Sequence, residues 1–344
     1  MKNLGYFSDK RILIIGGTGT IGNALVSEIL KQNPKVIRIF SRDEYKQFMM
    51  EASMPDEKKW KLRFLIGDVR DYDRVERAMS EIDIVFNLAA MKHVPACEYN
   101  PDEAIKTNVN GMQNVIKAAI KNKVKAVVFT SSDKAINPTN SYGATKLLAE
   151  KLVQSANYSK GPVNTKFVAV RFGNVMGSRG SVIPHFQRQI LEQRRITVTD
   201  DKMNRFMMSL SQAVALTMKA CEIGIGGEVF VLKMPVLKLK DLAEVVVEET
   251  CKKFSLSIND IGYETIGLRA GERMYEELMT AEEAVHAHDL QDMYAVLPTT
   301  FAMQVYEKSY AKYKHAEAKI YASYTQEPIS KEEIRELILK EKLI

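Results

Sequence analysis

A short apolar run leads directly into a glycine-rich turn near the start of this chain of 344 residues. The run RILIIG (11–16) begins the turn GGTGTIG (16–22), and the stretch IGNALVSEILKQ (21–32) then repeats apolar residues at helix spacing. A glycine turn between a strand and a helix lets a pyrophosphate approach the free N–H groups of the helix N-terminus. The pattern predicts a dinucleotide site rather than a turn used only for packing. Its expected contacts are Gly16, Thr18, Gly19, Thr20, Ile21 and Gly22.

Five further β-rich runs follow within the first 173 residues, separated by helical patterns such as NVNGMQNVIKAAIKN (108–122). Alternating helices and nearly continuous apolar strands are typical of a parallel sheet covered on both faces. We therefore expect an α/β fold with a Rossmann-type doubly wound parallel sheet over residues 1–173, to which later segments can return. The five runs are 35–40, 62–67, 83–89, 125–131 and 166–172.

The alternation loosens after residue 173. Glycine and proline cluster in GNVMGSRGSVIP (173–184), and helical patterns at 211–222 and 239–252 accompany short strand candidates near 196–199 and 229–232. We expect residues 174–344 to form mainly a smaller mixed α/β domain that binds the substrate, together with C-terminal helices. The stretch from about residue 305 is rich in Lys, Glu and Tyr, which predicts surface helices or a partly ordered tail.

Composition and charge argue against several classes of protein. The three cysteines, Cys97, Cys221 and Cys251, form no CxxC pair, so neither a zinc site nor a disulfide framework is supported, and no metal is expected. The net charge of +6 comes from interleaved acids and bases, which argues against nucleic-acid binding. No apolar run approaches the ~20 residues that span a bilayer, and the N-terminal run is too short for a signal peptide. We therefore expect a cytoplasmic protein without a membrane partner.

The end of the second strand indicates which dinucleotide binds. Ser41 and Arg42 follow this strand and Lys46 comes one turn later, where NAD-binding proteins carry an acid for the ribose 2′-hydroxyl. A hydroxyl and two cations suit a 2′-phosphate, which favours NADP, although Asp43 could still serve a ribose. The ends of the third and fourth strands complete the predicted cofactor site with Asp68, Val69, Ala89 and Ala90, a helix cap being the alternative role of Asp68.

Tyr142 and Lys146 lie four residues apart at the head of a helical stretch that follows the fifth strand. Residues at this spacing share one face of a helix. A lysine ammonium near a tyrosine, together with a positively charged nicotinamide ring, favours the phenolate and lowers a pKa that is ordinarily ~10. The pair predicts a tyrosine that acts as acid or base beside the cofactor, the alternative being a surface helix pair.

Motifs over residues 8–280 resemble those of extended short-chain dehydrogenase/reductases of the polysaccharide-biosynthesis group. They are GGTGTIG (16–22), SRDEYKQ (41–47), IGDVRD (66–71), AAMKHVP (89–95), SSDKAINPTNSYGATK (131–146), RFGNVMGSRGSVIPHF (171–186), TDDKMNRFMM (199–208), FVLKMP (230–235) and GLRAGERMYEEL (267–278). Within this group the chain looks most like soluble UDP-N-acetylglucosamine 4,6-dehydratases of the 5-inverting type. The resemblance implies an NADP-dependent lyase that makes a UDP-4-keto-6-deoxy-N-acetylhexosamine for surface-glycan or nonulosonic-acid biosynthesis.

The resemblance also implies a role for each residue of the catalytic segment. Tyr142, tuned by Lys146, takes the proton of the sugar 4-hydroxyl while the cofactor accepts hydride from carbon 4. Lys134 removes the carbon-5 proton and Asp133 protonates the departing 6-hydroxyl, two steps that a 4-epimerase does not need. Ser132 stands where the family usually has threonine and keeps the hydroxyl that contacts the sugar. Retaining relatives often carry methionine at the position of Tyr142, so the tyrosine favours inversion at carbon 5.

Polar residues elsewhere are predicted to bind the nucleotide-sugar. Lys92 and His93 follow the fourth strand, although His93 could equally be a packed histidine. By resemblance, Asn174 meets the diphosphate or the acetamido group. The segment 269–273 lacks the proline that the family commonly has there but keeps its charges. Phosphate or ribose contacts are expected from Arg179, Ser181, Arg205, Arg269 and Glu272.

Two alternatives remain open from the sequence. The first is a retaining 4,6-dehydratase or a nucleotide-sugar epimerase on the same fold. The second, more remote, is a non-catalytic NADP-binding protein, which the intact set of Ser132, Asp133, Tyr142 and Lys146 argues against. The family resemblance further implies a homo-oligomer, a dimer or a hexamer.

Overall fold

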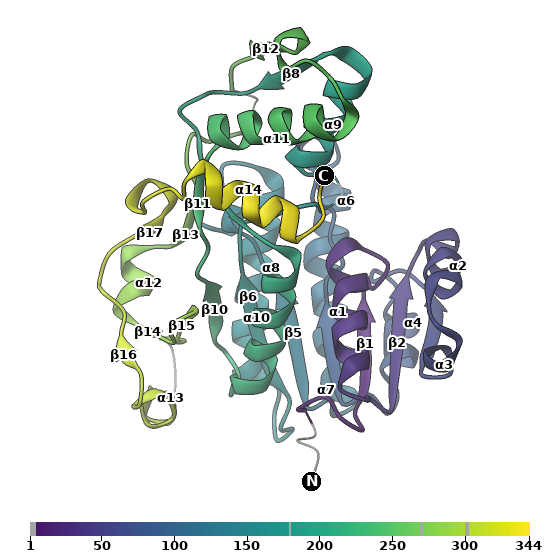
Figure 1. Cartoon of the computed structure of the whole chain (residues 1–344). Coiled ribbons are helices and arrows are strands. Elements are labelled where there is room, and N and C mark those ends of the chain that lie inside the picture. Colours follow the sequence, from purple (N-terminus) through teal and green to yellow (C-terminus); the bar gives the residue numbers. More distant parts are fainter. Residues whose placement is uncertain (1–4, 179, 269–270, 300–302) are drawn as a thin grey trace.

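A largely parallel sheet forms the centre of the molecule (Figure 1). The computed structural model describes residues 5–178, 180–268, 271–299 and 303–344. Within these residues the sheet has ten strands in the order β16-β14-β15-β10-β6-β5-β4-β1-β2-β3. The six strands expected before residue 173 are confirmed, and all six run parallel: β1 (Arg11–Ile15), β2 (Val36–Ser41), β3 (Leu62–Ile66), β4 (Ile84–Asn87), β5 (Ala126–Thr130) and β6 (Lys166–Arg171).

Later segments of the chain return to this sheet. β10 (Val229–Leu232) pairs parallel to β6 and is buried along its whole length. The expectation that this strand belongs to the smaller domain was wrong, because a continuous apolar run can bury both of its faces only inside a covered sheet. β14 (Ala287–Asp289), β15 (Met293–Val296) and β16 (Lys314–His315) then extend the sheet in antiparallel fashion.

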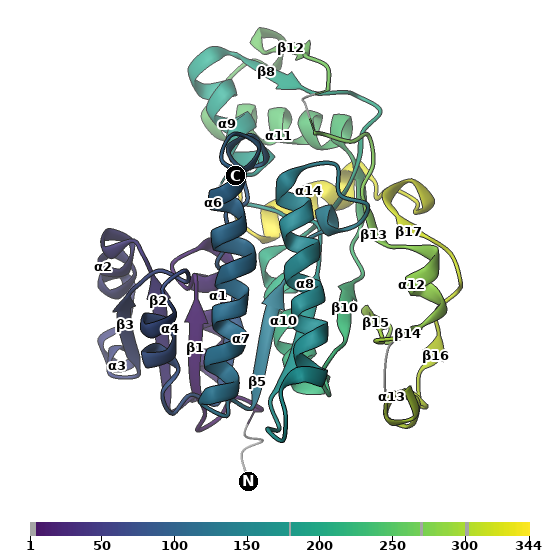
Figure 2. The same ribbon diagram turned by 180° about the vertical axis from the view of Figure 1, so that it is seen from behind.

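Helices cover both faces of the sheet, so the predicted doubly wound α/β fold is confirmed. α1 (Thr20–Lys31) and α10 (Leu210–Ile223) lie on the face seen in Figure 1. α4 (Tyr72–Met79), α7 (Gly111–Lys121) and α8 (Ser141–Ser159) lie on the opposite face, seen in Figure 2. The predicted helix 108–122 begins as a π-helical turn, η1 (Ile105–Asn110), that runs into α7. Shorter helices are α2 (Glu44–Ser53), α3 (Asp56–Lys59), α5 (Val94–Tyr99) and α6 (Pro101–Ala104).

A smaller unit lies beyond the carboxyl ends of the parallel strands (Figure 2). It has its own apolar core, to which three helices contribute: α9 (Val182–Gln193), α11 (Leu239–Phe254) and α14 (Lys331–Lys340). Its short strands are β7 (Asn174–Val175), β8 (Arg195–Val198), β9 (Asn204–Met208), β11 (Val236–Lys238) and β12 (Gly262–Thr265). Between this unit and the sheet edge run α12 (Ala281–Val285) and the paired strands β13 (Glu277–Met279) and β17 (Tyr321–Ala322).

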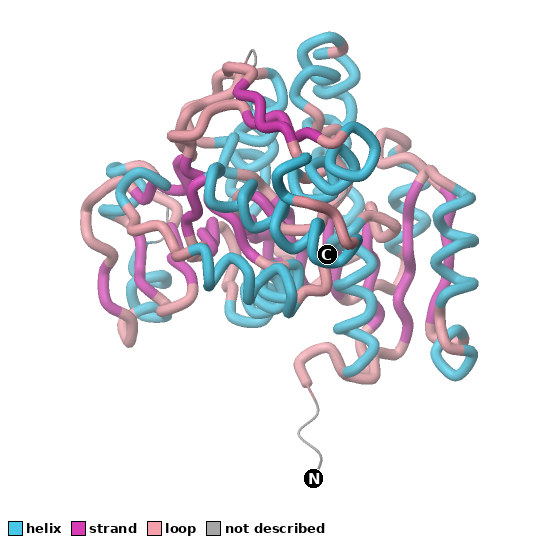
Figure 3. Tube along the Cα trace, turned by 45° about the horizontal axis from the view of Figure 1, so that its top comes forward, coloured by secondary structure: helices cyan, strands magenta, loops and turns pink. Residues whose placement is uncertain are grey.

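The C-terminal stretch is ordered by packing. It contains α13 (Met303–Tyr310) and α14, whose Ile334 and Ile338 are fully buried. Figure 3 shows the C-terminus among the helices. The expected surface helices are therefore present, and the apolar face of α14 is what holds this end of the chain in place.

Within the described ranges, no helix is long and apolar enough to cross a bilayer. The same residues include no cluster of three or more His, Cys, Asp or Glu side chains arranged to hold a metal ion. Cys97, Cys221 and Cys251 are buried free thiols.

Candidate active site

The glycine turn between β1 and α1 leaves room for a ligand against its backbone. Gly16 has a φ of +81°, and a Cβ there would lie 2.9 Å from the backbone nitrogen of Ala89 at the end of β4. A Cβ on Gly22 would lie 2.6 Å from the Cα of Gly17, so this glycine lets α1 pack onto the turn. Gly19 precedes α1 without a side-chain cap, so the first N–H groups of the helix can donate to a phosphate. The turn therefore fits a dinucleotide pyrophosphate.

The ends of β2 and β3 bring the other predicted cofactor residues together. Arg42 Nη1 lies 3.8 Å from Asp68 Oδ2, and the Arg42 side chain is 65% exposed. Lys46 forms an ion pair with Asp43, which also caps α2. Each cation thus has an acidic neighbour, and a 2′-phosphate would compete with Asp43 and Asp68 for them.

Three short segments assemble the predicted catalytic residues. β5 ends at Thr130, a 3₁₀ turn, η2 (Asp133–Ala135), follows, and α8 begins a few residues later. Asn140 caps α8 because its Oδ1 accepts the N–H of Gly143 at 2.8 Å. A Cβ on Gly143 would lie 2.1 Å from the carbonyl oxygen of Lys134. Only glycine at this position lets the head of α8 approach η2 so closely.

Asp133 is the centre of a hydrogen-bonded group. Its side chain is 2% exposed, and its two oxygens accept from Ser132 Oγ and from Lys134 Nζ, each at 2.7 Å. Burial raises the pKa of Asp133, but the charge of Lys134 and the hydrogen bonds from Lys134 and Ser132 together hold that pKa below its usual value. Burial lowers the pKa of Lys134, but the adjacent Asp133 carboxylate raises it well above its usual value. Asp133 and Lys134 are therefore an ion pair at neutral pH.

Tyr142 and Lys146 are both buried on α8. Burial raises the pKa of Tyr142 to about 12, against the opposing charge of Lys134 and a hydrogen bond with Ser132. Lys146 Nζ donates to the carbonyl oxygen of Thr130 at 2.8 Å, and burial lowers the pKa of Lys146 to about 7. In the protein by itself, Lys134 is the main cation that lowers the pKa of Tyr142. The expected effect of Lys146 together with the positive nicotinamide ring stays a prediction.

Glu276 completes this group, and it is not among the residues predicted from the sequence. Its side chain is 10% exposed, with Oε1 3.7 Å from Lys134 Nζ and 3.6 Å from Arg205 Nε. Its carboxylate also accepts from Asn174 Nδ2 and from the backbone N–H of Phe206, both at 2.9 Å. The available signal was its place in the motif GLRAGERMYEEL, but nothing local in that motif shows which of its acids reaches η2.

Arg205, the predicted diphosphate clamp, is engaged with the protein. Its Nη1 donates to the carbonyl oxygens of Asn204 and Met274, each at 3.1 Å. Its Nη2 donates to the carbonyl oxygen of Arg273 at 2.8 Å and to Glu272 Oε1 at 3.4 Å. The guanidinium thus ties β9 to the segment before β13. A diphosphate would have to replace some of these bonds, so the clamp stays a prediction.

The remaining predicted substrate residues lie around this region in varied settings. Lys92 and His93 are exposed before α5, and a Cβ on Gly180 would lie 3.1 Å from His93 Cε1. This exposure disfavours a packed histidine. Ser181 precedes α9, and among the described residues its buried Oγ has no hydrogen-bond partner. Arg179 and Arg269 lie outside the described residues.

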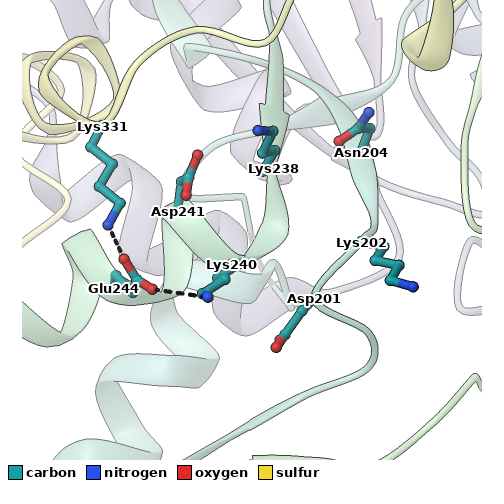
Figure 4. Close-up of a pocket in the computed structure, with 8 residues that line it drawn as sticks. All are labelled: Asp201, Lys202, Asn204, Lys238, Lys240, Asp241, Glu244 and Lys331. Atoms are coloured by element: carbon teal, nitrogen blue, oxygen red, sulfur yellow. Dashed lines mark hydrogen bonds and ion pairs between the residues drawn. The ribbon is translucent and has the colours of Figure 1, made fainter.

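A separate open hollow of about 620 Å³ lies in the smaller unit (Figure 4). Its lysines and acids neutralise one another, as in the contacts of Glu244 with Lys240 and Lys331. The described lining includes none of the predicted site residues, so this hollow is not the catalytic site. The lining residues are Asp201, Lys202, Asn204, Lys238, Lys240, Asp241, Glu244 and Lys331.

The sequence matches the family model described as "Polysaccharide biosynthesis protein" over residues 12–298. An uncharacterized membrane protein of Methanocaldococcus jannaschii is 50% identical over 85% of this chain and 87% of that protein. A UDP-glucose 4-epimerase of Rickettsia conorii is 42% identical over 97% of this chain and 96% of its own length.

Solved structures show the same fold. Pen from Bacillus thuringiensis is 56% identical, with a TM-score of 0.92 over 99% of this chain and 100% of that chain. The dTDP-glucose 4,6-dehydratase DesIV from Streptomyces venezuelae, solved with NAD bound, is 19% identical. Its TM-score is 0.66 over 77% of this chain and 86% of that chain, which is a likeness of fold.

Proposed function

We propose that this chain, which belongs to the polysaccharide biosynthesis protein family, is a nucleotide-sugar 4,6-dehydratase. The proposed substrate is UDP-N-acetylglucosamine, the proposed cofactor is NADP, and the proposed product is inverted at carbon 5. One observation carries the proposal: the buried Asp133 carboxylate forms an ion pair with Lys134 in the same group as Ser132 and Tyr142. Elimination of water across carbons 5 and 6 needs a base and an acid beside the residue that serves carbon 4.

The residues of this group can move every proton that the reaction requires. NADP, when bound, would supply the acceptor for the hydride of carbon 4 and the donor of hydride to carbon 6. Tyr142 takes the proton of the 4-hydroxyl, and the ketone that results acidifies the hydrogen on carbon 5. Lys134 takes that hydrogen as a proton, while Asp133 gives a proton to the departing 6-hydroxyl, which leaves as water. Carbon 5 is then reprotonated, so the two protons taken from the sugar balance the two that are given.

Lys134 must lose its own proton before it can act as a base. Its Nζ already donates to Asp133 Oδ2 at 2.7 Å, so one transfer along this hydrogen bond creates both a neutral amine and a protonated carboxyl group. A single proton shift therefore prepares the base and the acid together. This explains why the two roles fall on adjacent residues.

A nucleotide-sugar 4-epimerase is the second candidate, favoured by the name of the Rickettsia relative that matches nearly the whole chain. Epimerisation at carbon 4 needs Tyr142 and the cofactor, and it leaves Asp133 and Lys134 without a chemical task. The ion pair of Asp133 with Lys134 thus favours the dehydratase. The turn at Arg42 and Lys46 likewise supports NADP, although each has an acid beside it.

Product analysis in deuterated water separates the two candidates. The purified protein, supplied with NADP and UDP-N-acetylglucosamine, should form a 4-keto-6-deoxy sugar with deuterium at carbon 5, detected by NMR. Formation of UDP-N-acetylgalactosamine alone would refute the dehydratase. Replacing NADP with NAD in the same assay tests the proposed cofactor.

Asp133→Asn tests the residue on which the proposal depends. The variant keeps the shape of the side chain but cannot protonate the leaving hydroxyl, so product formation should fall at least ~100-fold. Asp289→Asn is the matched control, because Asp289 also pairs with a lysine, Lys233, but lies on β14, between β15 and β16. Unchanged activity of Asp133→Asn would remove the basis of the proposal.

A further inference from the structure

Glu276 joins the catalytic group to the smaller unit. Its backbone N–H donates to Ser323 Oγ at 3.0 Å, which fixes the segment before β13. Its carboxylate accepts from Asn174 on β7 and from the N–H of Phe206 on β9. The same carboxylate lies 3.7 Å from Lys134 Nζ, so Glu276 and Asp133 flank one ammonium.

We propose that Glu276 is a positioning residue for elimination, which acts as a neutral hydrogen-bonded acid beside Asp133 and sets the proton transfer between Asp133 and Lys134. The inference rests on the proposed function and adds a residue to it. Glu276 works through its two neighbours and need not touch the substrate.

The reason lies in the charge that Lys134 meets. If Glu276 were ionised, Lys134 would face two carboxylates, and both would oppose loss of its proton. If Glu276 is neutral, only Asp133 holds the ammonium, and transfer along the 2.7 Å hydrogen bond turns an ion pair into two neutral groups. A neutral Glu276 therefore makes the base and the acid easier to generate.

The surroundings of Glu276 favour the neutral form. Burial and the adjacent Asp133 carboxylate raise the pKa of Glu276, although Lys134 and Arg205 oppose them. Two close carboxyl groups do not readily ionise together, and the stronger hydrogen bonds of Asp133 leave the negative charge there. The groups facing Glu276 are Asp133 and Lys134 on η2, Arg205 and the N–H of Phe206 on β9, Asn174 on β7 and Ser323 near β17.

Three variants test the proposal by their pH profiles. Glu276→Gln is a neutral mimic whose amide oxygen can still accept from Asn174 and from the N–H of Phe206. Glu276→Ala removes the polar group altogether. Glu277→Gln is the matched control, because Glu277 bonds to Asn137 and takes no part in the group.

The expected results distinguish a positioning role of Glu276 from a purely structural one. Glu276→Gln should keep kcat at pH 7 within ~5-fold of wild type and carry activity at least one pH unit further into the alkaline range, with KM little changed. Glu276→Ala should lose at least ~100-fold in kcat. In a single turnover it should accumulate reduced cofactor, seen at 340 nm, because oxidation at carbon 4 proceeds and elimination stalls. Glu277→Gln should match wild type throughout.

Other outcomes would overturn the inference. If Glu276→Gln has the wild-type pH profile, or loses as much activity at pH 7 as Glu276→Ala, the neutral form is not what matters. Should Glu276→Ala fail to fold, the pH profile of Glu276→Gln still decides. The proposed function fails separately, if the wild-type protein forms only the epimer. If the wild-type protein is a dehydratase but the pH profile of Glu276→Gln is not shifted, only the inference about Glu276 is refuted.

Discussion

Replacing Gly143 with alanine should disable the enzyme while leaving most of its stability. The added Cβ would lie 2.1 Å from the carbonyl oxygen of Lys134, whereas real Cβ contacts rarely fall below 3.0 Å. Because both partners are backbone, η2 and the head of α8 must separate by about 1 Å. Asp133 and Lys134 then move relative to Tyr142, and a 1 Å misplacement can cost ~100-fold in rate. Strain of about 1–3 kcal/mol is partly offset by the ~1 kcal/mol that alanine gains over glycine in a helix.

The assay measures kcat for product formation, the Tm, and the Kd for NADP. We expect kcat to fall ~100-fold, the Tm to fall by a few degrees, and the Kd to stay within about threefold, because the glycine turn is untouched. Gly262→Ala is the control, since its nearest contact would be an ordinary 3.4 Å. A Gly143→Ala variant with kcat within twofold of wild type would refute the packing argument.

Charged side chains give three further expectations. Arg42→Ala should weaken NADP binding by about 10–100-fold in a fluorescence titration and leave NAD binding nearly unchanged; equal losses would contradict a 2′-phosphate contact. Burial lowers the pKa of Lys146 to about 7 in the folded protein, against ~10.4 in the unfolded chain. Between these two pH values the unfolded chain binds one more proton than the folded protein, so the free energy of unfolding rises with pH. Urea unfolding should show Lys146→Met to be more stable than wild type at pH 7, and this difference should shrink by up to ~1.4 kcal/mol per pH unit from pH 7 to 9. A difference that stays constant with pH would argue against a lowered pKa of Lys146. Arg171 is fully buried between two glutamates, so Arg171→Met should lower the free energy of unfolding by about 3–5 kcal/mol. Arg195 is exposed, so Arg195→Ala should lower it by at most ~1 kcal/mol. Similar losses for the two variants would contradict the argument from burial.

The sheet and the glycine turn were predictable because their causes are local. Strands such as β5 are continuous apolar runs, and a strand with both faces covered needs little else to be recognised. β10 has the same signature, yet the sequence analysis assigned it to the smaller unit. Its neighbour β6 lies about 60 residues earlier in the chain, and only the fold shows that the chain returns to the sheet.

The candidate site was predictable only in part, for the same reason. Asp133, Tyr142 and Lys146 fall within one motif, so their association could be inferred from spacing. Glu276 joins them from more than a hundred residues away, and its contacts with Asn174 and Phe206 depend on how β7 and β9 pair. The depressed pKa of Lys146 comes from burial, which the helix spacing does not reveal.

Arg205 links substrate binding to the proton transfer. It lies 3.6 Å from Glu276 and lowers the pKa of that acid. If a diphosphate draws the guanidinium away, as the sequence predicts for Arg205, Glu276 loses a neighbouring cation and its pKa rises further. Nucleotide binding would then favour the neutral acid that elimination needs. At an alkaline pH where Glu276 is ionised before UDP binds, calorimetry of UDP binding in two buffers of different ionisation enthalpy should show proton uptake for wild type and less for Glu276→Gln. Equal uptake in both would break this link.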